Sequence, residues 1–103
     1  PPDGIYATRV IDEGLGSMDA AAYIGARPTF EGAGRSIEAY VIDRENLKLY
    51  GRYVTLEFVG RVRGDQKFEG MEALVEQMNR DVARTREILA EDRAKTIQES
   101  EQP

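Results

Sequence analysis

The sequence predicts a mainly β protein, an antiparallel sheet or small barrel that carries one C-terminal helix. Three observations support this fold class. Apolar and polar residues alternate with a period of two in several short segments of the first two thirds of the chain. Glycine-containing turns separate these segments, and the long stretch with helical periodicity comes last. Strands followed by one helix, rather than strands alternating with helices, are typical of an antiparallel sheet with a helix packed on it.

The first two strands are expected on either side of a glycine turn. Residues 1–4 read as a turn, and residues 5–11 alternate as a strand does. Residues 12–17 contain Gly14 and Gly16 and form the next turn; no helix follows, so a phosphate-binding loop is not favoured there. Residues 18–24 are rich in alanine, and their assignment as a strand is ambiguous.

The middle of the chain is expected to leave the sheet briefly. Pro28 has no backbone N–H and restricts the residue before it, so residues 27–30 should leave the hydrogen-bonded ladder or lie at its edge. Thr29 is better explained as an edge-strand threonine than as a ligand-binding hydroxyl. Residues 31–35 contain two glycines and are expected to form a flexible connection, long enough to act as a flap.

The strand predicted over residues 36–43 carries a carboxylate that is a candidate general base. Its alternation places Glu38 on the same face as Tyr40 and Ile42, which is mostly apolar. Apolar surroundings disfavour the charged carboxylate and raise its pKa, which suits a general base near neutral pH. From physics alone the commoner situation is a glutamate at the rim of a sheet with its oxygens in water.

The second half of the chain is expected to hold a loop, a long strand and the helix. Residues 43–48 are polar, residues 53–62 alternate, and residues 61–67 read as an exposed loop. From residue 69 to about residue 90 the spacing predicts an amphipathic helix, after which the polar chain should fray. The apolar side of this helix, interpreted as core packing, is formed by Met71, Leu74, Val75, Met78, Val82, Thr85 and Leu89.

Composition restricts the chemistry that the chain can perform. The 103 residues carry a net charge of −5, from 14 basic and 19 acidic side chains, so a broad surface for nucleic acid is not expected. An apolar run of about 18 residues and a signal peptide are both absent, and we interpret the chain as cytoplasmic, without a membrane partner. Because it has no cysteine and no histidine, proton transfer would need a carboxylate, lysine or tyrosine, and a metal would be a hard ion such as Mg²⁺.

One local basic patch precedes the helix. Arg61, Arg63 and Lys67 lie at a place where a phosphate could be held near a helix N-terminus, although a solvated loop is the more common explanation. These residue patterns thus indicate a β-rich domain with one suggestive carboxylate, and they do not define a reaction.

The order of short motifs resembles the riboflavin kinase module at the C-terminal end of bacterial bifunctional FAD synthetases. The matching segments cover nearly the whole chain in the family's order. They are Asp-Gly-Ile-Tyr-Ala (3–7), Ile-Gly-Ala-Arg-Pro-Thr-Phe (24–30), Ile-Glu-Ala-Tyr-Val-Ile-Asp (37–43), Leu-Tyr-Gly (49–51), Leu-Glu-Phe-Val (56–59), Arg-Val-Arg-Gly-Asp-Gln-Lys-Phe (61–68) and a helix in which Leu74 and Gln77 lead into Arg80-Asp81-Val82.

The resemblance implies a riboflavin-kinase-like split antiparallel barrel, a Greek key of six strands, with a C-terminal helix. It implies transfer of the γ-phosphate of ATP to the 5′-hydroxyl of riboflavin, which gives FMN and ADP. Glu38 falls on the family's catalytic glutamate, which accepts the proton of that hydroxyl. Arg63 falls in the family's loop over the flavin, Lys67 and Phe68 are adjacent, and Leu74 is a residue that could border the flavin ring, although core packing explains it equally well.

The sequence departs from the family pattern in one respect. Family members carry an upstream Gly-x-Pro-Thr-Ala-Asn segment whose threonine and asparagine help to hold Mg²⁺ and the ATP phosphates, and this sequence begins after that point. Pro28-Thr29 is not a substitute, because it belongs to a later motif. Since phosphoryl transfer depends on positioning and charge neutralisation, weak nucleotide binding and little turnover are expected of the chain by itself. The barrel should also be incomplete at its N-terminal strands, which leaves an open edge.

Two interpretations of the chain remain. In the first, residues 1–90 are a partial riboflavin kinase domain from a larger FAD synthetase chain, followed by a polar tail over residues 91–103. In the second, the chain is a flavin-binding or protein-interaction module that keeps the barrel without the chemistry.

Overall fold

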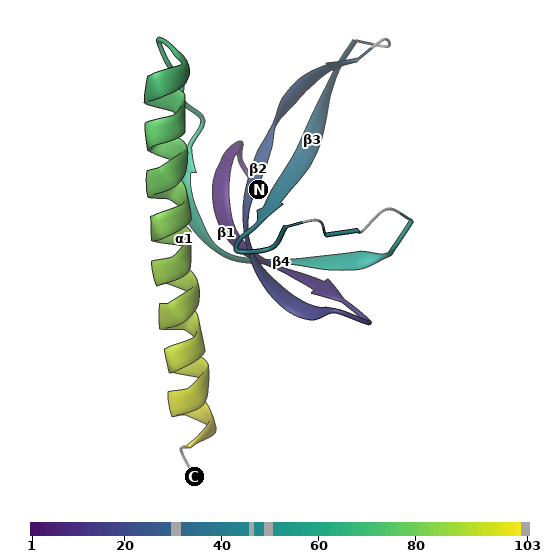
Figure 1. Ribbon diagram of the computed structural model, residues 1–103, viewed down its shortest axis with the longest axis vertical. Coiled ribbons are helices and arrows are strands. Elements are labelled where there is room, and N and C mark those ends of the chain that lie inside the picture. The colour runs from purple at the N-terminus through teal and green to yellow at the C-terminus, as the bar shows by residue number, and fades with distance from the viewer. Residues whose placement is uncertain (30–31, 46, 49–50, 102–103) are drawn as a thin grey trace.

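The computed structural model describes residues 1–29, 32–45, 47–48 and 51–101. Within these ranges the chain forms an antiparallel sheet of four strands and a long C-terminal helix that lies across one face of the sheet (Figure 1). None of the described helical structure is long and apolar enough to cross a membrane. The elements are β1 (Gly4–Asp12), β2 (Gly16–Thr29), β3 (Gly32–Val41), β4 (Val54–Gly64) and α1 (Met71–Ser100).

The strand order in the sheet is β3-β2-β1-β4, and every neighbouring pair is antiparallel. The prediction of a mainly β, antiparallel fold with a C-terminal helix is therefore confirmed. Of the six strands that the family resemblance implies, the described residues supply four. They form an open sheet in which β3 and β4 each have one strand neighbour. Leu49 and Tyr50, which belong to one of the quoted motifs, lie outside the described residues.

β2 and β3 form a longer hairpin than the sequence predicted. The ambiguous segment 18–24 is a strand, and β2 continues through Pro28, which pairs with Ala33 of β3. The prediction that residues 27–30 leave the hydrogen-bonded ladder is wrong for residues 27–29, which belong to β2. The alternative of an edge position fits, because β1 pairs with β2 only as far as Ile24. The expected flexible flap is also largely wrong, since residues 32–35 belong to β3; residues 30 and 31 lie outside the described residues.

Small side chains let α1 approach the middle of the sheet. Three residues that lie side by side on β2, β1 and β4 are Ala21, Ala7 and Gly60. A Cβ added at Gly60 would come within 3.0 Å of the Ile88 side chain on α1. Contact at this distance is tighter than ordinary packing allows, so the absence of a side chain on β4 sets the separation of helix and sheet.

Ion pairs attach the next part of α1 to the sheet. Arg9 of β1 lies between Glu57 of β4 and Asp92 of α1, and its guanidinium is 2.8 Å from a carboxylate oxygen of each. Arg93 of α1 is 3.1 Å from Asp19 of β2. These contacts lie beyond residue 90, and the helix continues to Ser100. The expectation that the chain frays after Glu91 is therefore wrong.

Two irregularities in β4 change which of its side chains face the helix. The pairing of β1 with β4 shifts between Ile5 and Tyr6 and again between Ala7 and Thr8. Bulges of this kind insert an extra residue in one strand and re-aim the side chains that follow. As a result Glu57, Gly60 and Arg63 face α1 at a spacing of three residues, whereas strict alternation would have a spacing of two.

The buried side of α1 differs from the predicted apolar side. The buried helix residues are Asp81, Thr85 and Leu89, at the four-residue spacing of one narrow face. Thr85 and Leu89 were expected there. Met71, Val75 and Met78 are exposed, so core packing is the wrong interpretation for the first two turns of the helix. The other side of the amphipathic helix is charged: Glu76 pairs with Arg80, and Arg84 pairs with Glu87.

The opposite face of the sheet carries its own apolar cluster. Val10, Met18 and Ala20 are buried there against Val41, Leu47 and Leu56. Tyr6 and Phe58 pack edge to face, with ring centroids 5.4 Å apart. This cluster stabilises the sheet from the face away from α1. Part of the face toward α1 therefore remains available for a site.

Candidate functional site

A row of four side chains crosses the sheet on the face toward α1. Glu38 of β3 pairs in register with Tyr23 of β2, Tyr23 pairs with Ile5 of β1, and Ile5 pairs with Arg63 of β4. Neighbouring strands are about 4.8 Å apart, so Glu38 and Arg63 lie roughly 14 Å from each other at opposite ends of the row. The fold thus places the carboxylate and the arginine that the sequence singled out along one line across the sheet.

A cavity of about 370 Å³ lies between this row, the loop after β4 and the first turns of α1. We call it the Glu38 cavity. Its volume is near the lower end of the range of about 300 to 1,000 Å³ that is typical of small-molecule sites. Its wall consists of Ile5, Tyr23, Glu38, Arg63, Asp65, Gln66, Phe68, Leu74, Met78 and Asp81.

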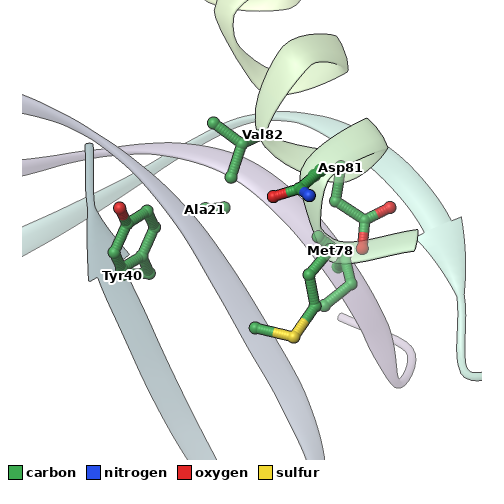
Figure 2. Close-up of a pocket in the computed structure, with 7 residues that line it drawn as sticks. Ala21, Tyr40, Met78, Asp81 and Val82 are labelled. Carbon is green, nitrogen blue, oxygen red and sulfur yellow. The ribbon is translucent and has the colours of Figure 1, made fainter. Parts of the chain in front are cut away.

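A second cavity of about 310 Å³, the Tyr40 cavity, adjoins the first and shares Ile5, Met78 and Asp81 with it. In Figure 2 Tyr40 and Ala21 lie on the sheet side, and Met78, Asp81 and Val82 project from α1. The two cavities together form an open, mostly apolar groove between helix and sheet. A groove with apolar walls and a few polar groups is the usual form of a binding site for a flat organic ligand.

Glu38 is exposed on the edge strand β3. Its neighbour on the same face, Tyr40, is 59% exposed. The sequence-based expectation that apolar neighbours surround this carboxylate is therefore wrong for the chain as described, and the position at a sheet rim fits instead. The edge position leaves the Glu38 carboxylate accessible to a ligand in the cavity.

A carboxylate on α1 fixes the position of the Arg63 side chain. Its Nε lies 2.9 and 3.0 Å from the two carboxylate oxygens of Asp81, and its Nη2 donates to Asp81 Oδ2 at 2.9 Å. Gln77 donates a further hydrogen bond of 3.0 Å to Asp81 Oδ1. The guanidinium also lies 5.5 Å from the ring centroid of Phe68, close enough for a cation–π contact. Arg63 is thus a fixed part of the cavity wall.

Tyr23 closes another side of the cavity. Its hydroxyl donates a hydrogen bond of 3.2 Å to Asp65, in the loop after β4. Burial of the phenol raises the pKa of Tyr23 above its usual value of 10.0, and the negative charge of Asp65 raises that pKa further. At neutral pH this side chain is therefore a protonated hydrogen-bond donor rather than a base.

Most of the sequence-predicted site residues meet in one place. Glu38, Arg63, Phe68 and Leu74 all line the Glu38 cavity, whereas Lys67 is exposed and does not line it. The basic patch suggested for residues 61–67 does not form. Arg61 donates to the backbone oxygen of Asp3, and Arg63 faces α1 from the last part of β4, which extends through the expected loop as far as Gly64.

Sequence reasoning missed Tyr23, Asp65 and Asp81. Asp81 had a usable signal, because it interrupts the apolar side of α1 one turn after Gln77, and a charge on such a face usually has a buried partner. Tyr23 and Asp65 had no comparable signal. Their approach depends on strand register and on the path of the loop, which local patterns do not encode.

The described residues do not supply a metal centre. No group of three or more acidic, histidine or cysteine side chains is placed to hold a metal ion in this part of the chain. Asp81 is occupied by Arg63 and Gln77, and Asp65 accepts from Tyr23. The Mg²⁺ that the resemblance implies therefore has no set of protein ligands among the described residues.

Comparison with known proteins identifies a family. A family model described as riboflavin kinase (Flavokinase) matches residues 1–89. The chain is 36% identical over 91 residues to the bifunctional riboflavin kinase/FMN adenylyltransferase of Pseudomonas fluorescens, and 32% identical over 88 residues to that of Escherichia coli (strain K12). The alignments cover 87% and 85% of this chain but 29% and 28% of the relatives. The chain thus spans less than a third of the length of these relatives.

A solved structure agrees with the fold. A crystal structure described as a macrolide-efflux protein from Streptococcus pneumoniae matches with a TM-score of 0.72 and 31% sequence identity. The match covers 84% of this chain and 28% of that chain. Because the family match extends over most of the sequence and agrees with the order of motifs, the chain belongs to the riboflavin kinase family.

Proposed function

We propose that this chain is the riboflavin kinase part of a larger bifunctional protein, and that the complete protein converts riboflavin to FMN with ATP as the phosphate donor. The observation that carries the proposal is the Glu38 cavity, which brings Glu38, Arg63, Phe68 and Leu74 together although they lie on four different segments of the chain. Family membership supplies the reaction, and the cavity supplies a place for its flavin substrate.

The apolar wall suits the flavin ring. Ile5 of β1, Phe68 of the loop after β4, and Leu74 and Met78 of α1 offer aliphatic, aromatic and thioether surface to the cavity. Burial of apolar surface contributes about 25 cal/mol per Å², so a flat ring gains affinity from such walls without a charged partner. The polar groups, Tyr23, Asp65 and Arg63, lie on the remaining sides and can orient the ring by hydrogen bonds.

In this proposal Glu38 accepts a proton. The ribityl chain of riboflavin ends in a 5′-hydroxyl, whose oxygen attacks the γ-phosphorus of ATP. A bond forms between the 5′-oxygen and phosphorus, the bond from phosphorus to the β,γ-bridging oxygen breaks, and ADP leaves. The hydroxyl proton goes to the Glu38 carboxylate, the role of a general base. Bound substrates would also exclude water from this exposed carboxylate and strengthen its electrostatic interactions.

The remaining features of the proposal rest on the family resemblance and on the composition and pattern of the sequence. Mg²⁺ accompanies ATP and neutralises phosphate charge when it is bound. The protein works in the cytoplasm on riboflavin and ATP, without nucleic acid or membrane as a partner. Residues 1–90 constitute the kinase unit and residues 91–103 a polar segment after it, while Lys67 is assigned an auxiliary contact with the substrate.

The proposal predicts that Glu38→Gln in the complete protein lowers kcat by at least about a hundredfold, the usual contribution of a general base. The amide keeps the size of the side chain but cannot accept the proton as a carboxylate does. The measurement is FMN formation from riboflavin and Mg-ATP by the purified protein. Riboflavin binding, measured by isothermal titration calorimetry, should change by less than about threefold, because the lost interaction acts on the transferred proton.

Glu57→Gln is the matched control. Glu57 is a half-exposed glutamate on β4 that pairs with Arg9 and does not line either cavity. Its variant should keep the wild-type turnover. Near wild-type turnover in Glu38→Gln would remove Glu38 from the reaction. A complete wild-type protein that binds riboflavin but makes no FMN would instead support a non-catalytic flavin-binding module.

A further inference from the structure

We propose that Asp81 is a positioning residue, which fixes Arg63 and, through Arg63, the Phe68 side of the Glu38 cavity. Its effect on flavin binding rests on the proposed function, since that function assigns the cavity to riboflavin. The proposal itself concerns how one carboxylate on α1 shapes a wall that is built from β4 and from the loop after it.

Asp81 is the most completely buried charged residue on α1, with 4% of its surface exposed. A buried carboxylate is stable only when its oxygens are matched by donors. Both oxygens are matched here, by Nε and Nη2 of Arg63 and by the side-chain amide of Gln77 one turn earlier. The two-pronged contact with Arg63 fixes the plane of the guanidinium as well as its distance, which a single hydrogen bond would not do.

The fixed guanidinium in turn determines the place of Phe68. Arg63 Nη1 donates to the backbone oxygen of Gly64 at 3.0 Å, and the guanidinium faces the Phe68 ring at 5.5 Å. Phe68 lies in the loop between β4 and α1, outside any strand or helix. Asp81, Arg63 and Phe68 thus connect helix, strand and loop around the same cavity, which all three line.

The ion pair also changes what Arg63 can offer to a ligand. Because Asp81 matches its positive charge, Arg63 presents a flat, nearly neutral unit and a few remaining N–H groups. Such a wall suits an uncharged aromatic ligand better than a phosphate. In this interpretation Arg63 contributes shape and stacking to the flavin side of the site.

The same helix provides a matched comparison. Asp92 also pairs with an arginine of the sheet, Arg9, with a distance of 2.8 Å, but neither residue lines the Glu38 or the Tyr40 cavity. A purely structural role would make the two pairs equivalent in their effect on ligand binding. If Asp81 has a positioning role, only loss of the pair between Asp81 and Arg63 weakens ligand binding.

The experiment measures riboflavin affinity by isothermal titration calorimetry, and Tm, for wild type, Asp81→Asn, Asp81→Glu, Arg63→Met, the Arg63→Met/Asp81→Asn double variant and Asp92→Asn. Loss of a partner that orients a ligand-contacting group costs about 10- to 100-fold in well-studied metal sites. We expect Asp81→Asn to weaken riboflavin binding about tenfold. Asp81→Glu keeps the charge but moves the carboxylate, so it should also weaken binding and provides the test if Asp81→Asn does not fold.

Two results distinguish a positioning role of Asp81 from a purely structural role. If Asp81 acts through Arg63, Asp81→Asn should add no further loss of affinity in the Arg63→Met background. Asp92→Asn should lower Tm and leave the riboflavin Kd unchanged. An unchanged Kd in both Asp81 variants, or an equal loss of affinity with and without Arg63, would overturn the proposal.

A third readout does not depend on flavin. In the NMR spectrum of the ligand-free protein, the Arg63 Nε–H should exchange slowly with water in wild type and Asp92→Asn and rapidly in Asp81→Asn. If the wild type binds no riboflavin, the proposed function fails and this signal alone decides about Asp81. Rapid exchange in the wild type would overturn the positioning role.

Discussion

At the scale of single residues, Gly25 determines where Tyr23 can lie. The two residues are on the same face of β2, and a Cβ added at Gly25 would overlap the hydroxyl end of the Tyr23 ring. The tyrosine therefore extends along its own strand, over the glycine, and reaches Asp65 on the far side of the cavity. An apparently ordinary glycine in a strand marks a place where a side chain from a neighbouring position needs the space.

This arrangement predicts that Gly25→Ala displaces Tyr23 toward solvent. The pKa of Tyr23, now raised by burial and by Asp65, should fall toward 10.0 in the variant, because the phenol regains water and loses its neighbour. The measurement is an NMR pH titration with ¹³C-labelled tyrosine. Asp65→Asn is the control, since it removes the charge without filling the space. Unaltered Tyr23 ring shifts in Gly25→Ala would show that the alanine is accommodated without displacement of the ring.

At the scale of elements, α1 changes its role along its length. Its first turns line the Glu38 and Tyr40 cavities with half-exposed residues such as Met78. Its middle is packed directly on the sheet, where Leu89 is fully buried, and ion pairs of Asp92 and Arg93 attach the turns that follow. Because the middle holds the helix in place, the first turns can border a groove without being buried themselves.

Leu89→Ala should therefore destabilise the fold by about 2 to 5 kcal/mol, the range for a fully buried leucine. Ile97→Ala on the same helix is the matched control, because Ile97 is 59% exposed. Its effect should remain within about 0.5 kcal/mol. Urea unfolding followed by circular dichroism measures both. Equal losses of stability would mean that the helix is not attached to the sheet through Leu89.

At the scale of the whole molecule, Asp12 connects distant parts of the chain. It is buried at the end of β1, accepts hydrogen bonds from the backbone N–H groups of Gly14 and Leu15, and pairs with Arg52, forty residues later. The Arg52 hydrogen bond, followed by that of the Leu15 N–H, lowers the pKa of Asp12 from 3.8 to about 2. The first turn of the sheet and the segment before β4 are thus held by one carboxylate.

The pKa of Asp12 determines how its contribution to stability depends on pH. Since the folded pKa lies below the unfolded one, the stabilisation is complete above about pH 4 and is lost as the pH falls toward 2. Asp12→Asn should therefore be less stable than wild type at pH 6, with a difference that shrinks at pH 2.5, as measured by urea unfolding midpoints. Asp43→Asn removes an exposed partner of Arg86 and should change stability less. A difference between Asp12→Asn and wild type that is independent of pH would contradict the assignment.

The sequence by itself determined much of this protein. Alternation and helical spacing are local properties, so they predicted the strands, the helix and the mainly β class, and the series of short motifs identified the family. The strand pattern also selected Glu38, and the family resemblance pointed to Arg63, Phe68 and Leu74 as well; the fold brings all four to one cavity. What local patterns could not give was the length of β2 and β3, because cross-strand pairing extends strands through Pro28 and the glycines that local propensity would exclude.

Tertiary structure alone decided how the site is built. The two bulges in β4 turn Arg63 toward α1, where it pairs with Asp81. Strict alternation would have put Arg61 and Arg63 on the same face of the sheet, whereas Arg61 instead donates to the backbone oxygen of Asp3. The register of the sheet aligns Glu38, Tyr23, Ile5 and Arg63, and the edge position of β3 leaves Glu38 exposed. Contacts of this kind join residues far apart in the chain. Their geometry is fixed by packing and register across elements, and the preferences of neighbouring residues in the sequence do not contain it.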